Sequence, residues 1–275
     1  MTRIWLCADD YGISASVNAA IRDLVVRGRI NATSVMVLAP SFQRAEALAL
    51  ETLNANARRV AIGLHVTLSA PFRPLSDGFA PLRNGAFLPL QALLIRACLR
   101  RLSAAALVTE IARQVRAFVD HFGRPPDFID GHQHVQLFPQ IRDALLTVAK
   151  RDAPGAWVRQ CGRARPFADA LGDRKGMLLD VLSSRFRRRA QALGVRTNPA
   201  FAGTYEFRDE ADFATIFPRF LDGLPDGSVV MCHPGFVDDE LQKLDPLTTL
   251  REQEYAFFVE QAFPDLLARH GVALA

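Results

Sequence analysis

Short apolar runs alternate along this chain with longer segments whose apolar residues recur at a helical period. Runs of about five to nine residues are typical of buried strands, whereas apolar spacing of three and four predicts helices with one buried face. The predicted strands are residues 3–8, 33–39, 60–68, 127–135, 156–161, 228–232 and 271–275. The predicted helices are residues 16–26, 41–50, 103–122, 139–150 and 248–269.

This alternation predicts a parallel sheet covered by helices. The number of strand candidates within 275 residues favours an irregular (β/α) barrel of the TIM-barrel type over an open doubly wound sheet. Neither an internal repeat nor a linker divides the chain, so we expect residues 1–275 to form a single domain.

Two regions depart from the alternation. Residues 69–89 are rich in proline and glycine and follow the predicted strand that carries His65, so we expect them to cover the functional face. Residues 162–203 are long and basic. Within them, residues 175–189 predict an amphipathic helix, which would either pack on the barrel or, if the substrate is a lipid, contact a membrane surface.

The composition narrows the classes of function. The 33 basic against 29 acidic residues give a net charge of +4, but no nucleic-acid-binding motif accompanies it, so we expect no nucleic acid partner. No run approaches the roughly 18–20 apolar residues that span a bilayer, and the N-terminus does not resemble a signal peptide. The four cysteines are widely spaced, which argues against a thiolate zinc site and favours a reducing cytoplasm.

Polar side chains gather where the predicted strands end. They are Asp9, Asp10, His65, Asp130, His132, His134 and His233. Because the carboxyl ends of parallel strands meet on one face of a barrel, these groups should lie together. One carboxylate with two imidazoles suits a divalent ion, Zn²⁺ first, and a second carboxylate nearby suits a general base.

Each of these residues also has a plainer interpretation. A single histidine at a strand end is often structural, and two aspartates before a helix can serve as its N-cap. His134 could support a ligand rather than bind the ion. The joint occurrence of so many such groups at strand ends makes the plainer interpretations weak as a set.

Four segments together resemble the YdjC-like (ChbG/HpnK) carbohydrate deacetylase family. They are ADDYGISASVNAAI, GLHVTLS, FIDGHQHVQLFPQI and VMCHPGF, and the resemblance runs from residue 3 to about residue 237. It implies an irregular (β/α) barrel, one divalent metal ion and removal of N-acetyl groups from an N-acetylated sugar. Many relatives have a histidine where this chain has Gln136, which would alter specificity if that side chain touches substrate.

The resemblance also implies a role for each matching residue. Asp10, His65 and His132 match the metal ligands, and Asp9 matches the catalytic base of related polysaccharide deacetylases. His233 is the first choice for the general acid and His134 the second, with a substrate contact as its other role. Independently of the resemblance, the position of Arg159 just after a predicted strand suggests that it orients Asp9 or a substrate carbonyl.

Alternatives remain open at this point. A barrel-type phosphoesterase would need more ligands, often a second metal ion, and basic groups for the phosphate; a binding module without activity would need a broken ligand set. The sequence leaves undecided whether the sugar is a chitooligosaccharide or a glucosaminyl lipid. It also leaves undecided whether the ion is Zn²⁺, Mg²⁺ or another divalent ion, and which oligomeric state the protein adopts.

Overall fold

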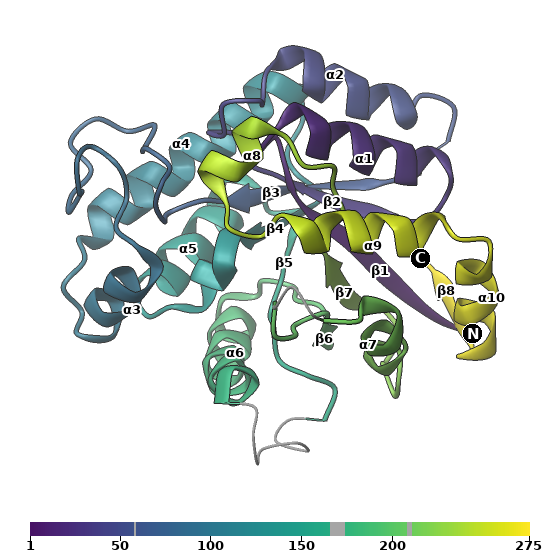
Figure 1. The fold of residues 1–275 in the computed structure, drawn as a ribbon. Helices are drawn as coiled ribbons and strands as arrows, with labels where there is room; N and C mark the ends of the chain where they lie inside the picture. The colour runs from purple at the N-terminus through teal and green to yellow at the C-terminus, as the bar shows by residue number, and fades with distance from the viewer. Residues whose placement is uncertain (58, 166–173, 208–210) are drawn as a thin grey trace.

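The computed structural model describes residues 1–57, 59–165, 174–207 and 211–275, and these form one α/β domain. Parallel strands make a curled sheet in the order β5-β4-β3-β2-β1-β7-β6, and β8 pairs with the first residues of β1. Helices cover the outside of this sheet, and both chain termini lie on the same side of the molecule (Figure 1). This is the irregular (β/α) barrel that the alternation of the sequence predicts.

The strands are β1 (Thr2–Tyr11), β2 (Ala32–Val35), β3 (Ala61–Val66), β4 (Phe128–Gly131), β5 (Trp157–Val158), β6 (Phe201–Ala202), β7 (Ser228–Cys232) and β8 (Val272–Leu274). Between β5 and β6, the two ends of the strand path, contacts are few. The Phe201 amide donates to the Gly162 carbonyl, and Val158 forms a bridge with Thr197. The barrel is therefore closed only loosely at this point.

The helices are α1 (Ala15–Val26), α2 (Arg44–Leu53), α3 (Leu90–Cys98), α4 (Ala104–Phe122), α5 (Ile141–Asp152), α6 (Arg174–Leu193), α7 (Phe213–Phe220), α8 (Asp239–Leu244), α9 (Thr249–Val259) and α10 (Ala262–Arg269). Helix α1 begins where predicted, because the Ser14 side chain accepts a hydrogen bond from the Val17 amide. Helix α4 ends at Gly123, whose φ of 71° gives the left-handed C-cap.

Several predicted elements were wrong in extent. The strand expected over residues 33–39 ends at Val35, and the one expected over residues 156–161 is only Trp157–Val158. Two further differences have a local cause. The helix expected over residues 248–269 is two helices, because the Pro264 ring would clash with the carbonyl of Glu260, where α9 ends. The strand expected over residues 127–135 ends at Gly131. A 3₁₀ segment, η1 (His132–Leu137), follows it and contains Gln133 and His134 at φ of 55° and 59°.

The core lies between the sheet and its helices. Strands β1, β2, β3, β4 and β7 are almost entirely buried, which explains their continuous apolar runs. None of the helices in the described part of the chain combines the length and apolar character needed to cross a membrane. The apolar runs of the sequence therefore form the buried core of the barrel.

Candidate metal site and catalytic groups

Asp9 and Asp10 reach the same face because β1 is irregular at this point. Successive strand residues normally point to opposite sides. The pairing of β1 with β2 shifts register between Ala8 and Tyr11, and Asp10 has a φ of 68°. The resulting bulge turns both carboxylates toward the carboxyl ends of the strands, as bulges beside active sites commonly do.

His65 and His132 complete a compact group with Asp10. His65 lies in β3 and His132 follows β4. The Asp10 Oδ1 atom lies 3.3 Å from His65 Nε2 and 3.0 Å from His132 Nδ1, and all three residues are buried. Their ligand atoms lie within 4.8 Å of one another. One carboxylate and two imidazoles at this separation suit a divalent ion with a free coordination position.

Asp130 orients His65 from behind. Its Oδ1 atom lies 2.6 Å from His65 Nδ1, so the ring keeps a proton at Nδ1 and turns Nε2 toward Asp10. Burial lowers the pKa of a histidine, yet Asp130 and then Asp9 raise that of His65 to about 10. A carboxylate behind a ligating histidine is the usual second contact of such ligands in metalloproteins.

Asp9 is tied to Arg159 through both of its oxygens. Arg159 Nη1 donates to Oδ2 at 2.6 Å and Nη2 donates to Oδ1 at 2.7 Å. Although burial opposes it, the charges of Arg159 and His65 hold the pKa of Asp9 below its usual range. Arg159 is fully buried beneath the site and also pairs with Asp130 at 2.6 Å, so it acts on Asp9 rather than facing the cavity.

Asp10 is paired with a different arginine. Arg251 of α9 donates from Nη2 to Asp10 Oδ2 at 2.7 Å. Although burial opposes it, the charges of His132 and Arg251 hold the pKa of Asp10 well below its usual range. Arg251 could not be identified from the sequence, because nothing in the pattern of α9 separates it from a solvent-exposed arginine.

His233 follows β7 and is held by its backbone. Its amide donates to Glu254 Oε2 at 2.5 Å, and the Tyr205 hydroxyl donates to Glu254 Oε1 at 2.7 Å. Burial lowers the pKa of His233 to about 4, and Arg251 adds to this effect. Burial also raises the pKa of Glu254 to about 7 against the opposing hydrogen bonds.

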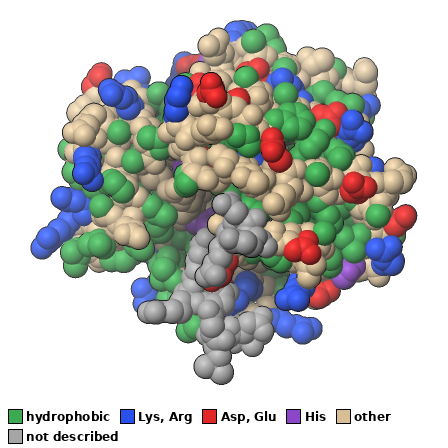
Figure 2. Space-filling view, in the orientation of Figure 1, with side chains coloured by type: hydrophobic (Ala, Val, Ile, Leu, Met, Phe, Trp, Pro, Cys, Tyr) green, Lys and Arg blue, Asp and Glu red, His purple; other side chains and the backbone are tan. Residues whose placement is uncertain are grey.

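A cavity of about 310 Å³ opens above these groups. It is visible as a hollow with histidine surface near the centre of Figure 2. The candidate residues that line it are Asp9, Asp10, His65, His132, His134 and His233. Its other walls come from Leu90, Gln133, Phe207 and Met231 and, before and within α9, from residues 245–248 and 250. Its size and mixture of apolar and polar walls are those of a small-molecule site.

Residues 69–89 contribute less to this cavity than expected. The Phe72 ring packs edge-on against His132, with centroids 5.7 Å apart, so the loop begins beside the candidate ligands. None of the described lining residues belongs to it. Gln136, where many relatives have histidine, is buried below the site, and its amide nitrogen lies 3.4 Å from the Arg159 carbonyl oxygen.

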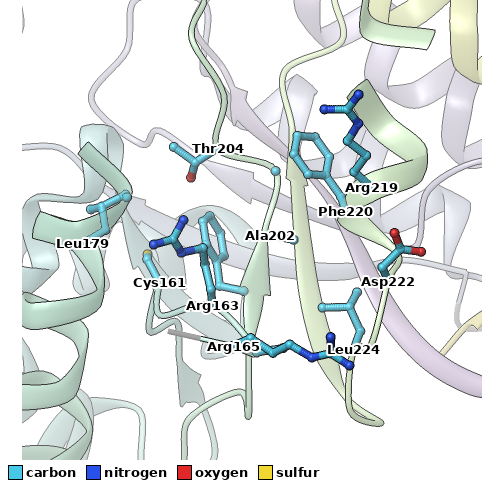
Figure 3. A pocket seen from close by; sticks show the side chains of 14 residues that line it. Cys161, Arg163, Arg165, Leu179, Ala202, Thr204, Arg219, Phe220, Asp222 and Leu224 are labelled. Atoms are coloured by element: carbon cyan, nitrogen blue, oxygen red, sulfur yellow. The ribbon is translucent and has the colours of Figure 1, made fainter. Parts of the chain in front are cut away.

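A second, larger cavity of about 510 Å³ lies between α6 and α7 (Figure 3). Arg163, Arg165 and Arg219 line it, and Arg163 is paired with Asp180 at 2.7 Å. Its wall includes Phe201, whose ring also contacts His134. Of the candidate catalytic and ligand residues, none is among the described lining residues of this cavity.

Comparison with known proteins identifies relatives that cover most of the chain. The model of the family described as "YdjC-like protein" matches residues 3–269. The chain is 32% identical over 271 residues to a chitooligosaccharide deacetylase of Proteus mirabilis, covering 97% of this chain and 94% of that one. It is 30% identical over 234 residues to one of Serratia marcescens, covering 84% and 81%.

Among solved structures, one from Enterococcus faecalis V583 shares the fold. It is described as a proposed cellobiose-phosphate cleavage protein and superimposes with a TM-score of 0.76 at 20% identity, covering 100% of this chain and 97% of that one. At that identity the likeness concerns the fold alone.

Proposed function

Because this chain belongs to the YdjC-like protein family, we propose that it is a metal-dependent hydrolase that removes N-acetyl groups from an amino sugar. The observation that carries the proposal is the group of Asp10, His65 and His132 at the floor of a sugar-sized cavity, with Asp9 beside it. Two relatives that cover most of the chain are chitooligosaccharide deacetylases, which favours a chitooligosaccharide over a glucosaminyl lipid as substrate.

In this proposal Asp10, His65 and His132 hold the ion. When bound, a divalent ion supplies Lewis acidity toward the acetamide oxygen and acidifies bound water. Asp9, fixed by Arg159, accepts the proton of the attacking water. The walls of the cavity exclude bulk water from the acetamide and orient it above the floor.

The departing amine requires a proton donor. His233 is our first choice, because it lines the cavity and its backbone is fixed by Glu254. A histidine with a pKa of about 4 is neutral at pH 7, so in this proposal the proton that Asp9 takes from water passes to His233 before His233 donates it to the amine. His134, which lines the same cavity and is also half-buried, is the alternative donor.

A phosphoesterase with two metal ions fits the structure less well. Cys7, Asp9 and Asp130 form a second group with ligand spacing. The Arg159 guanidinium already occupies it, with Nη2 3.0 Å from Cys7 Sγ and 2.6 Å from Asp130 Oδ2. A fixed cation among these three residues opposes a second divalent ion there.

The experiment is an acetate assay on metal-free protein reconstituted with Zn²⁺, Mg²⁺ or Co²⁺. We expect acetate release from N-acetylglucosamine oligomers with at least one of these ions and none after chelation. A phosphate monoester serves as the competing substrate. Phosphate release without acetate release would replace this proposal by the phosphoesterase, and activity that survives chelation would contradict the metal dependence.

A further inference from the structure

Arg251 of α9 is buried and pairs with Asp10, a carboxylate at the floor of the cavity. Arg251 is fully buried, although arginine is rarely so unless it is paired. Its Nε atom donates to the Leu247 carbonyl at 2.9 Å, and its Nη2 atom lies 3.2 Å from Asp245 Oδ2. The guanidinium is therefore held in place independently of Asp10.

The two oxygens of Asp10 have different surroundings. Oδ1 faces both imidazoles, at 3.3 Å from His65 Nε2 and 3.0 Å from His132 Nδ1. Oδ2 points the other way and accepts from Arg251 at 2.7 Å. One oxygen thus faces only imidazole nitrogens, which can exchange a proton for an ion, and the other is occupied by a permanent cation.

We propose that Arg251 is a positioning residue that limits Asp10 to a single ligand oxygen. This inference rests on the function proposed above. Both oxygens of a carboxylate can bind the same ion, and the second would take up the position that water and substrate need. Three single-atom ligands with an open position are the arrangement of catalytic zinc sites.

The same arginine must weaken metal binding. It is a fixed positive charge one carboxylate away from a divalent ion, and like charges repel strongly in a buried site. Orienting contacts around metal ligands normally strengthen affinity, and their loss weakens binding about 10–100-fold. Arg251 should behave in the opposite way, because it keeps an oxygen away from the ion rather than presenting one to it.

The test compares Arg251→Met with the wild-type protein. Methionine keeps an apolar stem of similar width but removes the charge and the donors. We expect the variant to bind Zn²⁺ more tightly than wild type, measured by chelator competition. The Co²⁺ form should change its visible absorption as the coordination number changes, and kcat for acetate release should fall about 10–100-fold with the site loaded.

Each outcome of the Arg251→Met test either supports or overturns the inference. Zn²⁺ binding weakened tenfold or more would show an ordinary supporting role and overturn the inference, as would an unchanged Co²⁺ spectrum with unchanged kcat. If the wild-type protein binds none of Zn²⁺, Co²⁺ and Mg²⁺, the proposed function fails and this inference fails with it. If Arg251→Met does not fold, Arg251→Lys tests the positioning role alone. Its shorter side chain loosens the contact with Oδ2 but keeps the positive charge, so the Co²⁺ spectrum and kcat should change in the same direction without tighter Zn²⁺ binding; an unchanged spectrum with unchanged kcat would overturn the inference.

Arg124→Met is the matched control. Arg124 also forms ion pairs, with Glu51 at 2.8 Å and Asp127 at 3.4 Å, but it lies before β4 and therefore at the opposite end of the strands. We expect its Zn²⁺ affinity, Co²⁺ spectrum and kcat to equal those of wild type. A change of the same size in this control would show that the loss of any ion pair produces the effect.

Discussion

Two adjacent aspartates, Asp9 and Asp10, are each paired with a buried arginine, and the two pairs are built differently. Arg159 bonds to both oxygens of Asp9, whereas Arg251 bonds to one oxygen of Asp10 and leaves the other beside two histidines. A carboxylate fixed at both oxygens keeps one orientation, as a base must. A carboxylate fixed at one oxygen presents the other to an ion. The difference explains how neighbouring identical residues can take different roles.

The largest expected effect is that of Asp10→Ala, which tests whether Asp10 is the metal ligand of the pair. It reduces the protein ligands from three to two, so we expect metal content to fall from about one ion per chain to almost none. Acetate release should fall by more than about 10⁴-fold, beyond the contribution of a positioned base. Elemental analysis and the acetate assay measure both effects, and retention of the ion would show that Asp10 is not a ligand.

The second is Asp9→Asn, which keeps the shape but removes the charge of the proposed base. The ligand set stays intact, so the metal content should match that of wild type. Turnover should fall about 10²–10⁴-fold, the usual contribution of a general base. An empty metal site in Asp9→Asn together with a loaded one in Asp10→Ala would reverse the two roles.

The third prediction concerns the free energy of unfolding. Arg159→Met leaves Asp9 and Asp130 as buried charges without their cation, which should lower the free energy of unfolding by about 3–5 kcal/mol. Arg124→Met, whose arginine is partly exposed, should cost about 1 kcal/mol or less. Urea denaturation of both variants provides the comparison. Equal losses would mean that the Arg159 pair contributes no more than a surface pair.

The smallest effect is the pH dependence of Glu254, which fixes the His233 backbone. Its pKa is raised from 4.5 to about 7, so the folded state binds the proton more tightly than the unfolded state does, and protonation of Glu254 stabilises the fold. That stability is fully present below pH 4.5 and is lost as the pH rises through 7, by about 3 kcal/mol in total. Glu254→Gln should remove this dependence, seen as the difference between the two unfolding curves from pH 4.5 to 8; identical pH profiles would contradict it.

Much of the fold could be predicted from the sequence, because buried parallel strands leave apolar runs and helices leave a periodic pattern. The boundaries that failed depended on local chemistry, such as the break at Glu260 before Pro264 and the left-handed residues Gln133 and His134. Helices α3, α7 and α8 were not predicted, because they have nine, eight and six residues, too few to show a clear helical period.

Some residues of the candidate site could likewise be predicted from the sequence, and others could not. Residues at strand ends, such as Asp10, His65 and His132, could be grouped from sequence because the barrel brings those ends together. Arg251 and Glu254 could not, because they belong to a helix far along the chain and only the tertiary structure turns them inward. Their burial in α9 beside apolar Leu250 gives no periodic signal that separates them from exposed polar residues.

The most direct test of the account is the position of the ion. A crystal of the wild-type protein soaked in Zn²⁺, with anomalous diffraction recorded on both sides of the zinc absorption edge, locates it independently of activity. We predict one peak, bonded to Asp10 Oδ1, His65 Nε2 and a nitrogen of His132, with Arg251 still on Asp10 Oδ2. A peak among Cys7, Asp9 and Asp130, or a Zn²⁺ ion bound by both oxygens of Asp10, would contradict it.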